Sequence, residues 1–543
     1  MSSTARSALL PYLLACLIAL AVLCAFWYAL GKPVILADAA SPTHKLQCAS
    51  YTPFDKDQSP YDKPLKLRPE RVDADLALLA TRFQCIRTYS MTGLEDIPAL
   101  ARKHGLKVMM GAWVSREPTD TQVEINALIA SANANPDVVT SVIVGNEALL
   151  RKEVTGAQLV ALIRQVKAAV RQPVTYADVW EFWDQYPQVG EAVDFLTIHL
   201  LPYWEDHPKS IDDALTHVAA IHDDFAQRFA PREVVIGETG WPSEGRQRQT
   251  ALPSRVNEAR FIRSFVGMAE QRGWHYNLIE AFDQPWKRAN EGAVGGYWGL
   301  FDADRQNKGV LEGPVSNLPF WPQWLGAGAL LGLLLLVAAG RPQASGGRTL
   351  GGKQVPERST GARLRSAILA PPAVAVLPAL VAVAAASLGI WGELMRVTAR
   401  FYGEWAWATV MVALNLVVVL HAALLIAQPS GGVRAQVLGW LERRAGAWAM
   451  AAGFAGAVMM LQMVFEPRYR SFPSAALVVP ALVYVCRPVQ VRRNETLLLA
   501  LLIGAGVVAQ MAREGLQNPQ AWGFALISAL LAAGLWRCAR VGR

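Results

Sequence analysis

The sequence predicts a (β/α)8 barrel joined to an all-α membrane region. Between Lys45 and Phe282, short apolar runs alternate with amphipathic helical stretches, which is the pattern of βαβ units and of a parallel sheet. Two of the runs end in a carboxylate, Glu147 and Glu238, at the strand end where parallel barrels keep their chemistry. After Pro319 the chain becomes a succession of long apolar segments, typical of membrane-spanning helices.

Length and charge support a division of the chain into parts. The 543 residues exceed a single core. Residues 31–318 hold 31 Lys and Arg against 37 Asp and Glu, whereas the rest holds 21 against 7. The positive net charge therefore belongs to the membrane part, where it favours basic cytoplasmic loops and argues against a nucleic-acid surface. We expect an N-terminal anchor over 1–30, a barrel over 31–318 and a membrane domain over 319–543.

The first apolar segment, residues 8–30, is long enough to span a bilayer and follows Arg6. The competing interpretation is a signal peptide cut near Ala37-Asp-Ala39. The apolar segment 8–30 is longer than the ~7–15 residues usual for such peptides. We therefore expect a retained anchor that enters from the cytoplasm.

Eight apolar runs are the expected barrel strands, and eight in about 240 residues fit the (β/α)8 fold. They are Leu46–Tyr51, Cys85–Thr88, Leu106–Gly111, Val138–Gly145, Val174–Ala177, Asp194–His199, Glu233–Gly237 and Tyr276–Phe282. The clearest helical stretches are Asp73–Arg82, Thr121–Ala134, Thr155–Ala169 and Val256–Arg272. The alternative is a doubly wound open sheet. A nucleotide-binding fold of this kind has a Gly-rich phosphate loop after the first strand, and the segment there, Tyr51-Thr-Pro-Phe-Asp55, contains no glycine.

About seven further spans are expected after the barrel: 320–339, 366–391, 405–427, 447–465, 474–486, 494–511 and 521–537. If the barrel lies outside, the inside segments carry 16 Lys and Arg and the short outside loops carry 5. This asymmetry places the barrel in the periplasm or at the cell exterior, and it predicts a Gly-, Ser- and Arg-rich cytoplasmic linker over 340–365.

Cysteine usage leaves one question open. Cys48 and Cys85 fall in the first two expected strands and could pair in an oxidising compartment, although buried free cysteines are ordinary small hydrophobes. No cysteine spacing suggests a metal site, and we expect neither a metal nor a cofactor.

Glu147 and Glu238 are the candidate catalytic residues. An isolated carboxylate at a partly buried strand end is costly unless it is partnered or protonated. Two of them suggest a shared task, as in glycoside hydrolysis, where a retaining mechanism uses carboxyl groups about 5–5.5 Å apart. The plainer interpretation is that either Glu pairs with an arginine such as Arg87.

Aromatic and polar residues at the other expected strand ends would suit a saccharide cleft, because sugars have apolar faces and hydroxyl edges. Each aromatic residue alone could be packing, and a lone strand-end histidine is more often a hydrogen-bonding partner than a ligand. The candidate substrate-binding residues are Asn146, Tyr51, Arg87, Tyr89, His199, Tyr203, Trp241, Glu280, Trp286 and Lys287.

Three ordered motifs carry a family resemblance: Val144-Gly-Asn-Glu147, Gly237-Glu-Thr-Gly-Trp-Pro242, and Phe282-Asp-Gln-Pro-Trp-Lys287 followed by Tyr297-Trp-Gly-Leu-Phe301. Together they resemble glycoside hydrolase family 17, in particular its bacterial membrane-anchored branch of β-glucan synthases or transglycosylases. The resemblance covers roughly residues 45–315. It implies a retaining enzyme for β-1,3-glucans, with Glu147 as acid/base and Glu238 as nucleophile.

The sequence departs from the plant-type pattern after the eighth strand, where Gln284 replaces the auxiliary glutamate. Glu280 or Glu291 could substitute for it. We therefore expect a β-glucan hydrolase or transglycosylase in a bacterial inner membrane, with a β-glucan and the lipid bilayer as partners. The alternative is a non-catalytic periplasmic glucan sensor. A nucleotide-sugar synthase would need a cytoplasmic domain that the linker is too short to form.

Overall fold

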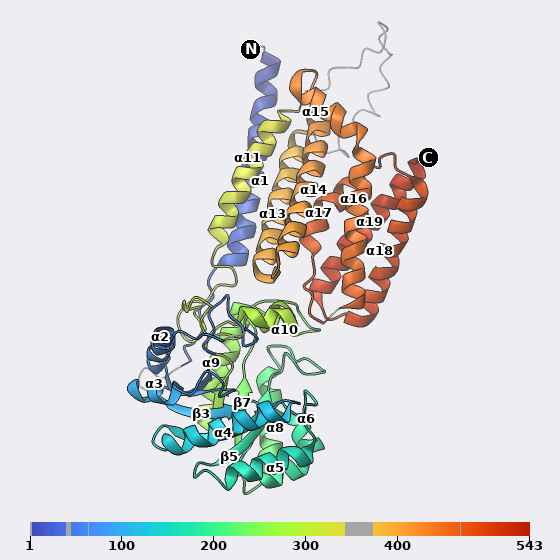
Figure 1. Cartoon of the computed structure of the whole chain (residues 1–543). Coiled ribbons are helices and arrows are strands. Elements are labelled where there is room, and N and C mark those ends of the chain that lie inside the picture. The colour runs from blue at the N-terminus through green and yellow to red at the C-terminus, as the bar shows by residue number, and fades with distance from the viewer. Residues whose placement is uncertain (1–2, 40–44, 63–64, 343–372, 467, 543) are drawn as a thin grey trace. The chain divides into compact units, whose positions relative to one another are not determined.

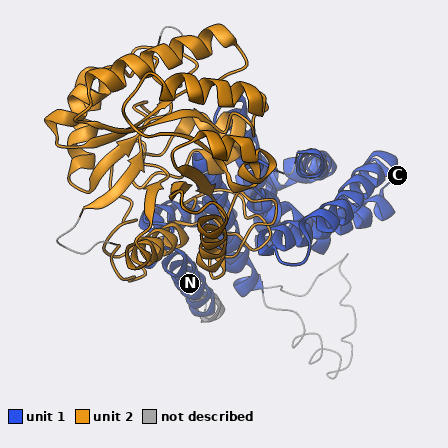
Figure 2. Ribbon diagram, turned by 90° about the horizontal axis from the view of Figure 1, so that it is seen from below, with its two compact units in different colours: residues 1–32, 317–543 blue, residues 33–316 orange. Residues whose placement is uncertain are grey.

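The computed structural model describes residues 3–39, 45–62, 65–342, 373–466 and 468–542. They form two compact units (Figure 2): Pro33–Ser316, called the barrel unit, and Met1–Lys32 with Asn317–Arg543, called the helical unit. Most of the expected linker 340–365 lies outside the described residues.

The barrel unit contains a closed barrel of eight parallel strands in sequence order, with β1 beside β8 (Figure 1). This confirms the predicted fold class. The strands are β1 (Leu46–Ser50), β2 (Phe83–Arg87), β3 (Lys107–Ala112), β4 (Val139–Asn146), β5 (Val174–Val179), β6 (Leu196–Leu200), β7 (Val234–Thr239) and β8 (His275–Leu278). All six residues of β7 are buried, as expected for parallel strands covered on both faces.

Helices separate the strands: α2 (Pro69–Ala80), α3 (Ile97–Lys103), α4 (Pro118–Ala134), α5 (Gly156–Lys167), α6 (Trp180–Gln185), α7 (Pro187–Ala192), α8 (Ala214–Arg228) and α9 (Arg255–Arg272). A 3-10 turn, η1 (Pro285–Lys287), and α10 (Arg288–Gly295) follow β8. Local chemistry fixes several ends. Thr155 and Gln158 form a capping box at α5, and Gly273, at φ 68°, ends α9 in the left-handed region.

The last strand is shorter than the sequence predicted. The expected strand ran from Tyr276 to Phe282, but β8 ends at Leu278. Beyond it, the amide of Glu280 donates to Trp298 O and the amide of Leu300 donates to Glu280 O. The chain therefore leaves the ladder with β7 because a later segment offers it partners, and this brings Glu280 to the rim of the barrel.

One buried arginine holds the two ends of the barrel unit together. Val34 and Val315 form an antiparallel bridge. Arg263 of α9 donates to the carbonyl oxygens of Val310, at 2.9 Å, and Leu36, at 3.1 Å, on the two end segments. It also donates to the carbonyls of Gly309 and Gly313, both at 2.7 Å.

The sulfur atoms of Cys48 and Cys85 are joined as a disulfide, with a Cα–Cα distance of 4.6 Å. The two residues are register partners on β1 and β2. They belong to a small buried cluster with Met109, Ile143 and Ala177.

The helical unit consists of α1 (Ser3–Gly31), α11 (Trp321–Ala339), α13 (Ala373–Thr398), α14 (Tyr402–Ala427), α15 (Gly432–Arg443), α16 (Ala445–Phe465), α17 (Ser474–Cys486), α18 (Arg493–Glu514) and α19 (Pro519–Val541). Seven of these are long and apolar enough to cross a membrane, and α17 is a shorter apolar helix. The sequence prediction treated 428–446 as a loop, and α15 occupies most of it.

We expect Arg263→Ala to destabilise the barrel unit by about 2–4 kcal/mol, because several carbonyls lose a charged donor in a buried place. Chemical denaturation of the full-length protein in detergent would measure the loss. The matched control is Arg260→Ala on the same helix, since Arg260 is half exposed and pairs with the exposed Asp212. Its loss should stay below about 1 kcal/mol. Equal losses of stability in the two variants would mean that the hydrogen bonds of Arg263 to the backbone carbonyls do not stabilise the barrel unit.

Candidate active site

The backbone around Glu147 is strained and held from β5. Glu147 has φ 52°, in the left-handed region that a non-glycine residue occupies at a cost of about 1–3 kcal/mol. Its amide donates to Ala177 O at 2.7 Å, and the next turn is fixed by Leu149 N, which donates to Tyr176 Oη at 2.9 Å. The strand therefore ends sharply at Asn146, and the Glu147 side chain is left partly open to solvent.

Glu238 reaches the same place from β7. The ladder between β6 and β7 shifts register between Ile198 and His199, and such irregularities change the direction of side chains. Gly237 permits a close approach here, since a Cβ atom on it would lie 2.4 Å from Thr197 Cγ2. The Glu238 side chain is only 6% exposed.

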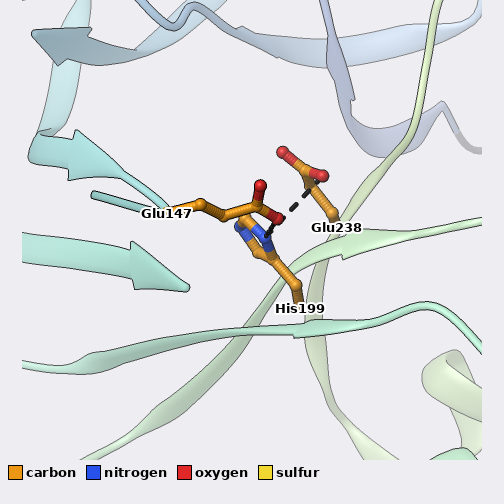
Figure 3. Close-up of side chains that lie close together, drawn as sticks. All are labelled: Glu147, His199 and Glu238. Atoms are coloured by element: carbon orange, nitrogen blue, oxygen red, sulfur yellow. Dashed lines mark hydrogen bonds and ion pairs between the residues drawn. The ribbon is translucent and has the colours of Figure 1, made fainter. Parts of the chain in front are cut away.

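Figure 3 shows Glu147, His199 and Glu238 converging from three strand ends. His199 Nδ1 lies 2.9 Å from Glu147 Oε1 and 3.7 Å from Glu238 Oε2. One polar atom from each of the three lies within 4.8 Å of the others. Carboxyl groups this close fit the ~5–5.5 Å separation of retaining glycosidases, and they are too close for the ~6.5–9.5 Å of inverting ones.

Arg87 ties the two carboxylate-bearing strands together. Its Nη1 donates to Glu238 Oε1 at 3.0 Å and to Gly237 O at 2.7 Å, while Nη2 donates to Asn146 Oδ1 at 2.5 Å. The guanidinium lies over the Tyr89 ring, 4.7 Å from its centroid. Glu238 therefore does pair with Arg87, but its second oxygen still faces His199 and Glu147.

The electrostatics of Glu147 reflect two opposing influences. Burial raises the pKa of Glu147, and the hydrogen bond and charge of His199, aided by Arg151 and Arg87, outweigh burial and lower the pKa overall. In the ligand-free site Glu147 is therefore held as a carboxylate.

A second acidic group lies on the β8 side. Burial raises the pKa of Glu280 to about 7, although Lys287 Nζ donates to both of its oxygens at 2.9 Å and partly offsets the effect. Burial also raises the pKa of Glu291, and the charges of Glu147 and Glu238 add to this rise. Both candidates for the missing auxiliary glutamate thus lie within electrostatic reach of Glu238. Gln284 itself accepts from Trp286 Nε1 at 2.9 Å.

Tyr176 and Asp178 were not among the candidate binding residues, although they support Glu147. The Tyr176 hydroxyl donates to Asp178 Oδ2, which lies 3.4 Å from Leu150 N in the turn after Glu147. Burial, followed by the charge of Glu147, raises the pKa of Asp178 to about 7. A polar pair spaced i, i+2 at the end of an apolar strand was the sequence signal.

Three of the aromatic candidates are buried and bonded to other parts of the barrel unit. Tyr51 donates to Asp75 of α2 at 3.2 Å, Tyr203 donates to Arg246 O at 2.6 Å, and Trp241 donates to Leu252 O at 3.0 Å. All three belong to the apolar core of the barrel unit. The structure brings together Asn146, Arg87, Tyr89, His199, Glu280 and Lys287, and it places Trp286 half buried beside Phe54 and Tyr61.

Glu147, His199 and Glu238 are spaced closely enough to hold a cation. Yet Glu238 Oε1 already accepts from Arg87, and His199 Nδ1 bonds to Glu147. A fixed guanidinium on one of the ligands opposes a second positive charge, so the donor set fits carboxylate chemistry better than metal binding.

The sequence of the barrel unit is similar to known glycoside hydrolases. Residues 48–299 match the model of the BtgE/BtgC glycoside hydrolase domain. A glucan 1,3-beta-glucosidase of Arthroderma benhamiae is 28% identical over 276 aligned positions, and the match covers 47% of this chain and 84% of that protein. A probable beta-glucosidase, btgE, of Aspergillus flavus is 30% identical over 243 residues, which are 43% of this chain and 39% of that protein.

Among solved structures, the family 17 β-1,3-glucanosyltransferase of Rhizomucor miehei is 26% identical, with a TM-score of 0.43, and the match covers 49% of this chain and 96% of that one. The family-model match ends before the helices that follow residue 316. Residues 48–299 of the barrel unit are thus similar to the BtgE/BtgC glycoside hydrolase domain.

We expect Asp178→Asn to flatten the dependence of stability on pH. A folded-state pKa near 7 lies above the ~3.9 of an unfolded aspartate, so Asp178 favours the folded state below about pH 4 and this contribution is lost as the pH rises to 7. Thermal melting between pH 4.5 and 7.5 should fall less steeply in the variant than in the wild type.

The control is Asp137→Asn. The hydrogen bond from Arg102 lowers the pKa of Asp137 to about 2, so its contribution is complete above about pH 4. This variant should leave the slope between pH 4.5 and 7.5 unchanged. A wild-type slope in the Asp178→Asn protein would contradict the burial of an uncharged Asp178.

Proposed function

We propose that this chain, whose barrel unit is a glycoside hydrolase-type enzyme domain, is a membrane-anchored retaining enzyme for β-1,3-glucans. It cleaves the glucan and passes the glycosyl group to water or to another sugar. The observation that carries the proposal is the convergence of Glu147 and Glu238 within 4.8 Å at the carboxyl ends of β4 and β7. The fungal relatives named as glucan 1,3-beta-glucosidase and β-1,3-glucanosyltransferase supply the substrate class.

In the first step, a Glu238 oxygen attacks the anomeric carbon while Glu147 gives its proton to the bridging oxygen of the leaving sugar. The bond between the carbon and that oxygen breaks, and a glycosyl ester forms on Glu238. In the second step, Glu147 takes the proton from water or from an acceptor hydroxyl, whose oxygen displaces Glu238 from the anomeric carbon.

The surrounding charges suit these roles. Arg87 Nη1 donates to Glu238 Oε1 at 3.0 Å and so holds the carboxylate of the nucleophile in a fixed orientation. Glu147 must be protonated in the first step, whereas its pKa in the ligand-free site is lowered. A sugar ring that displaces water increases the burial of Glu147, and burial raises the pKa of a carboxyl group, so substrate binding favours the acid form.

Once Glu238 is esterified, its negative charge is gone. The loss of a like charge within 4.8 Å lowers the pKa of Glu147, and Glu147 can then act as the base of the second step. Asn146 and the Glu280–Lys287 pair carry hydrogen-bonding groups beside the carboxylates, and we assign them to the sugar hydroxyls.

The seven long apolar helices and the excess of Lys and Arg on one set of loops support a multi-pass membrane protein. We place the barrel outside the cytoplasm of a bacterial cell, with α1 retained as an anchor. A glucan leaving the cell would meet the barrel there.

Glu238→Ala should lower turnover of laminari-oligosaccharides by at least about a thousandfold, because no nucleophile replaces it. Glu147→Ala should lower kcat/KM for the same substrates about 10²- to 10⁴-fold but spare β-laminaribiosyl fluoride, whose leaving group needs little protonation. Glucose and fluoride release by the full-length protein would measure both. Glu233→Gln, half exposed at the opposite end of β7, is the matched control. Full activity of Glu238→Ala would refute the assignment, and glucan binding without any wild-type turnover would favour a sensor.

Placement of the barrel outside the cytoplasm has a chemical consequence for Cys48 and Cys85, because disulfides persist in oxidising compartments. We expect protein denatured in iodoacetamide to leave both cysteines unmodified unless it is first reduced, as measured by peptide mass spectrometry. The free cysteine Cys486, which is exposed, serves as the control and should be alkylated without reduction. Full alkylation of Cys48 and Cys85 without reduction would contradict the proposed location.

A further inference from the structure

Trp113 is a solvent-open aromatic residue beside the catalytic carboxylates. It follows β3 directly and is 37% exposed, whereas Tyr51, Tyr203 and Trp241 are buried. Leu150, just beyond Glu147, is 38% exposed. Large apolar side chains left open at the rim of a polar site are typical of binding surfaces.

A buried carboxylate holds the Trp113 backbone in place. Glu124 of α4 is only 6% exposed, and its Oε2 accepts from Trp113 N at 3.0 Å and from Met91 N at 2.7 Å. Its Oε1 accepts from Thr92 N at 2.9 Å. One carboxylate thus ties together the loops after β2 and β3, and Trp113 is presented from a rigid support.

Arg151 fixes which side of the site Trp113 lies on. Its guanidinium carbon is 3.9 Å from the centroid of the indole, and its Nη2 donates to Val114 O at 3.0 Å. It also donates to Asn146 O, and its charge lowers the pKa of Glu147. Arg151 therefore lies between Trp113 and the acid/base. The guanidinium covers one indole face, and Trp113 as a whole is still 37% exposed.

We propose that Trp113, backed by Arg151 and extended by Leu150, is the platform for the sugar on the acceptor side of the scissile bond. The inference rests on the proposed function. Glu147 protonates the oxygen that leaves and deprotonates the hydroxyl that enters, so the sugar carrying that oxygen must lie on the Glu147 side. A glucosyl ring offers axial C–H groups to an indole face. The ligand class is a β-glucan sugar unit, first as leaving group and then as acceptor.

The chemistry at this platform is the second half of the proposed reaction. An acceptor hydroxyl oxygen forms a bond to the anomeric carbon, the ester bond to Glu238 breaks, and the hydroxyl proton goes to Glu147. An acceptor that is already oriented on Trp113 competes with ~55 M water because its translational and rotational freedom is already lost.

A different aromatic ledge lies on the β8 side, where Phe54 and Tyr61 meet Trp286 edge to face with ring centroids 6.2 Å and 5.9 Å from it. Tyr61 is 69% exposed. Trp286 adjoins Lys287, which donates to Glu280, and the charge of Glu238 adds to burial in raising the pKa of Glu280. This ledge provides the comparison residue, on the donor side.

The test compares two donors with the full-length protein in detergent. β-Laminaribiosyl fluoride occupies the donor side with only a fluoride as leaving group, whereas laminaripentaose needs sugar sites on both sides. Trp113→Ala should lower kcat/KM for laminaripentaose about tenfold, because the sugar loses its aromatic support, and leave kcat/KM for the fluoride within about twofold.

With added laminaribiose, the fraction of fluoride turnover that ends in longer products should fall in Trp113→Ala and recover in Trp113→Phe. Tyr61→Ala should affect both donors alike. Equal losses on the two donors, or no loss on either, would overturn the platform. Circular dichroism of each variant checks folding.

Failure of the proposed function gives a separate result. Wild-type protein that releases neither fluoride nor glucose, or a Glu238→Ala protein that still releases both, would refute the catalytic assignment and this inference with it. A wild-type enzyme that only hydrolyses still tests the platform, because the comparison of the two donors does not require transfer.

Discussion

The site depends on one buried guanidinium. Arg87 at the end of β2 donates to the Glu238 carboxylate and the Gly237 carbonyl on β7, and to Asn146 on β4. Burying a cation at 1% exposure is costly unless its donors are satisfied, and here two nitrogens have close partners. One rigid, planar side chain thus bridges β7, which carries Glu238, and β4, which ends just before Glu147.

The acidic side chains around Arg87 each have a different partner. Glu238 has a guanidinium partner, Glu280 has an ammonium partner in Lys287, and Glu147 has the imidazole of His199. Each acid has a cationic or titratable partner at the rim of the barrel. Burial outweighs the partner at Glu280 and raises its pKa to about 7, whereas at Glu147 the partner outweighs burial and the pKa is lowered, so these two glutamates differ in protonation.

Buried polar groups also organise the scaffold outside the site. Arg263 ties both ends of the barrel unit to α9. Lys308 lies 3.0 Å from Asp283 and 3.2 Å from Glu258, and its Nζ also donates to Ser243 Oγ at 2.8 Å in the loop after β7. Glu124 does the same for the loops after β2 and β3. In each case one charged side chain replaces several backbone contacts that irregular loops cannot make to each other.

Much of the fold and half of the site could be predicted from the sequence. The alternation of short apolar runs with amphipathic helical stretches located all eight strands. The carboxylates at 147 and 238 stood out because an unpaired acid at the end of a buried strand costs free energy. The sequence could not show that Tyr51, Tyr203 and Trp241 turn into the core, since an aromatic residue at a strand end looks the same whichever way it points. Glu124 was missed as well, although it is an acid on the apolar stripe of α4 beside Thr121 and Leu128.

The sequence by itself determined which side chains stand at the ends of strands, because periodicity and breakers are local properties of the chain. Only the tertiary structure decided which of them meet. The 90 residues between Glu147 and Glu238 carry no information about distance until the barrel closes β1 on β8 and the register shifts turn both acids towards His199. Closure is a property of all eight strands together, and no local pattern encodes it.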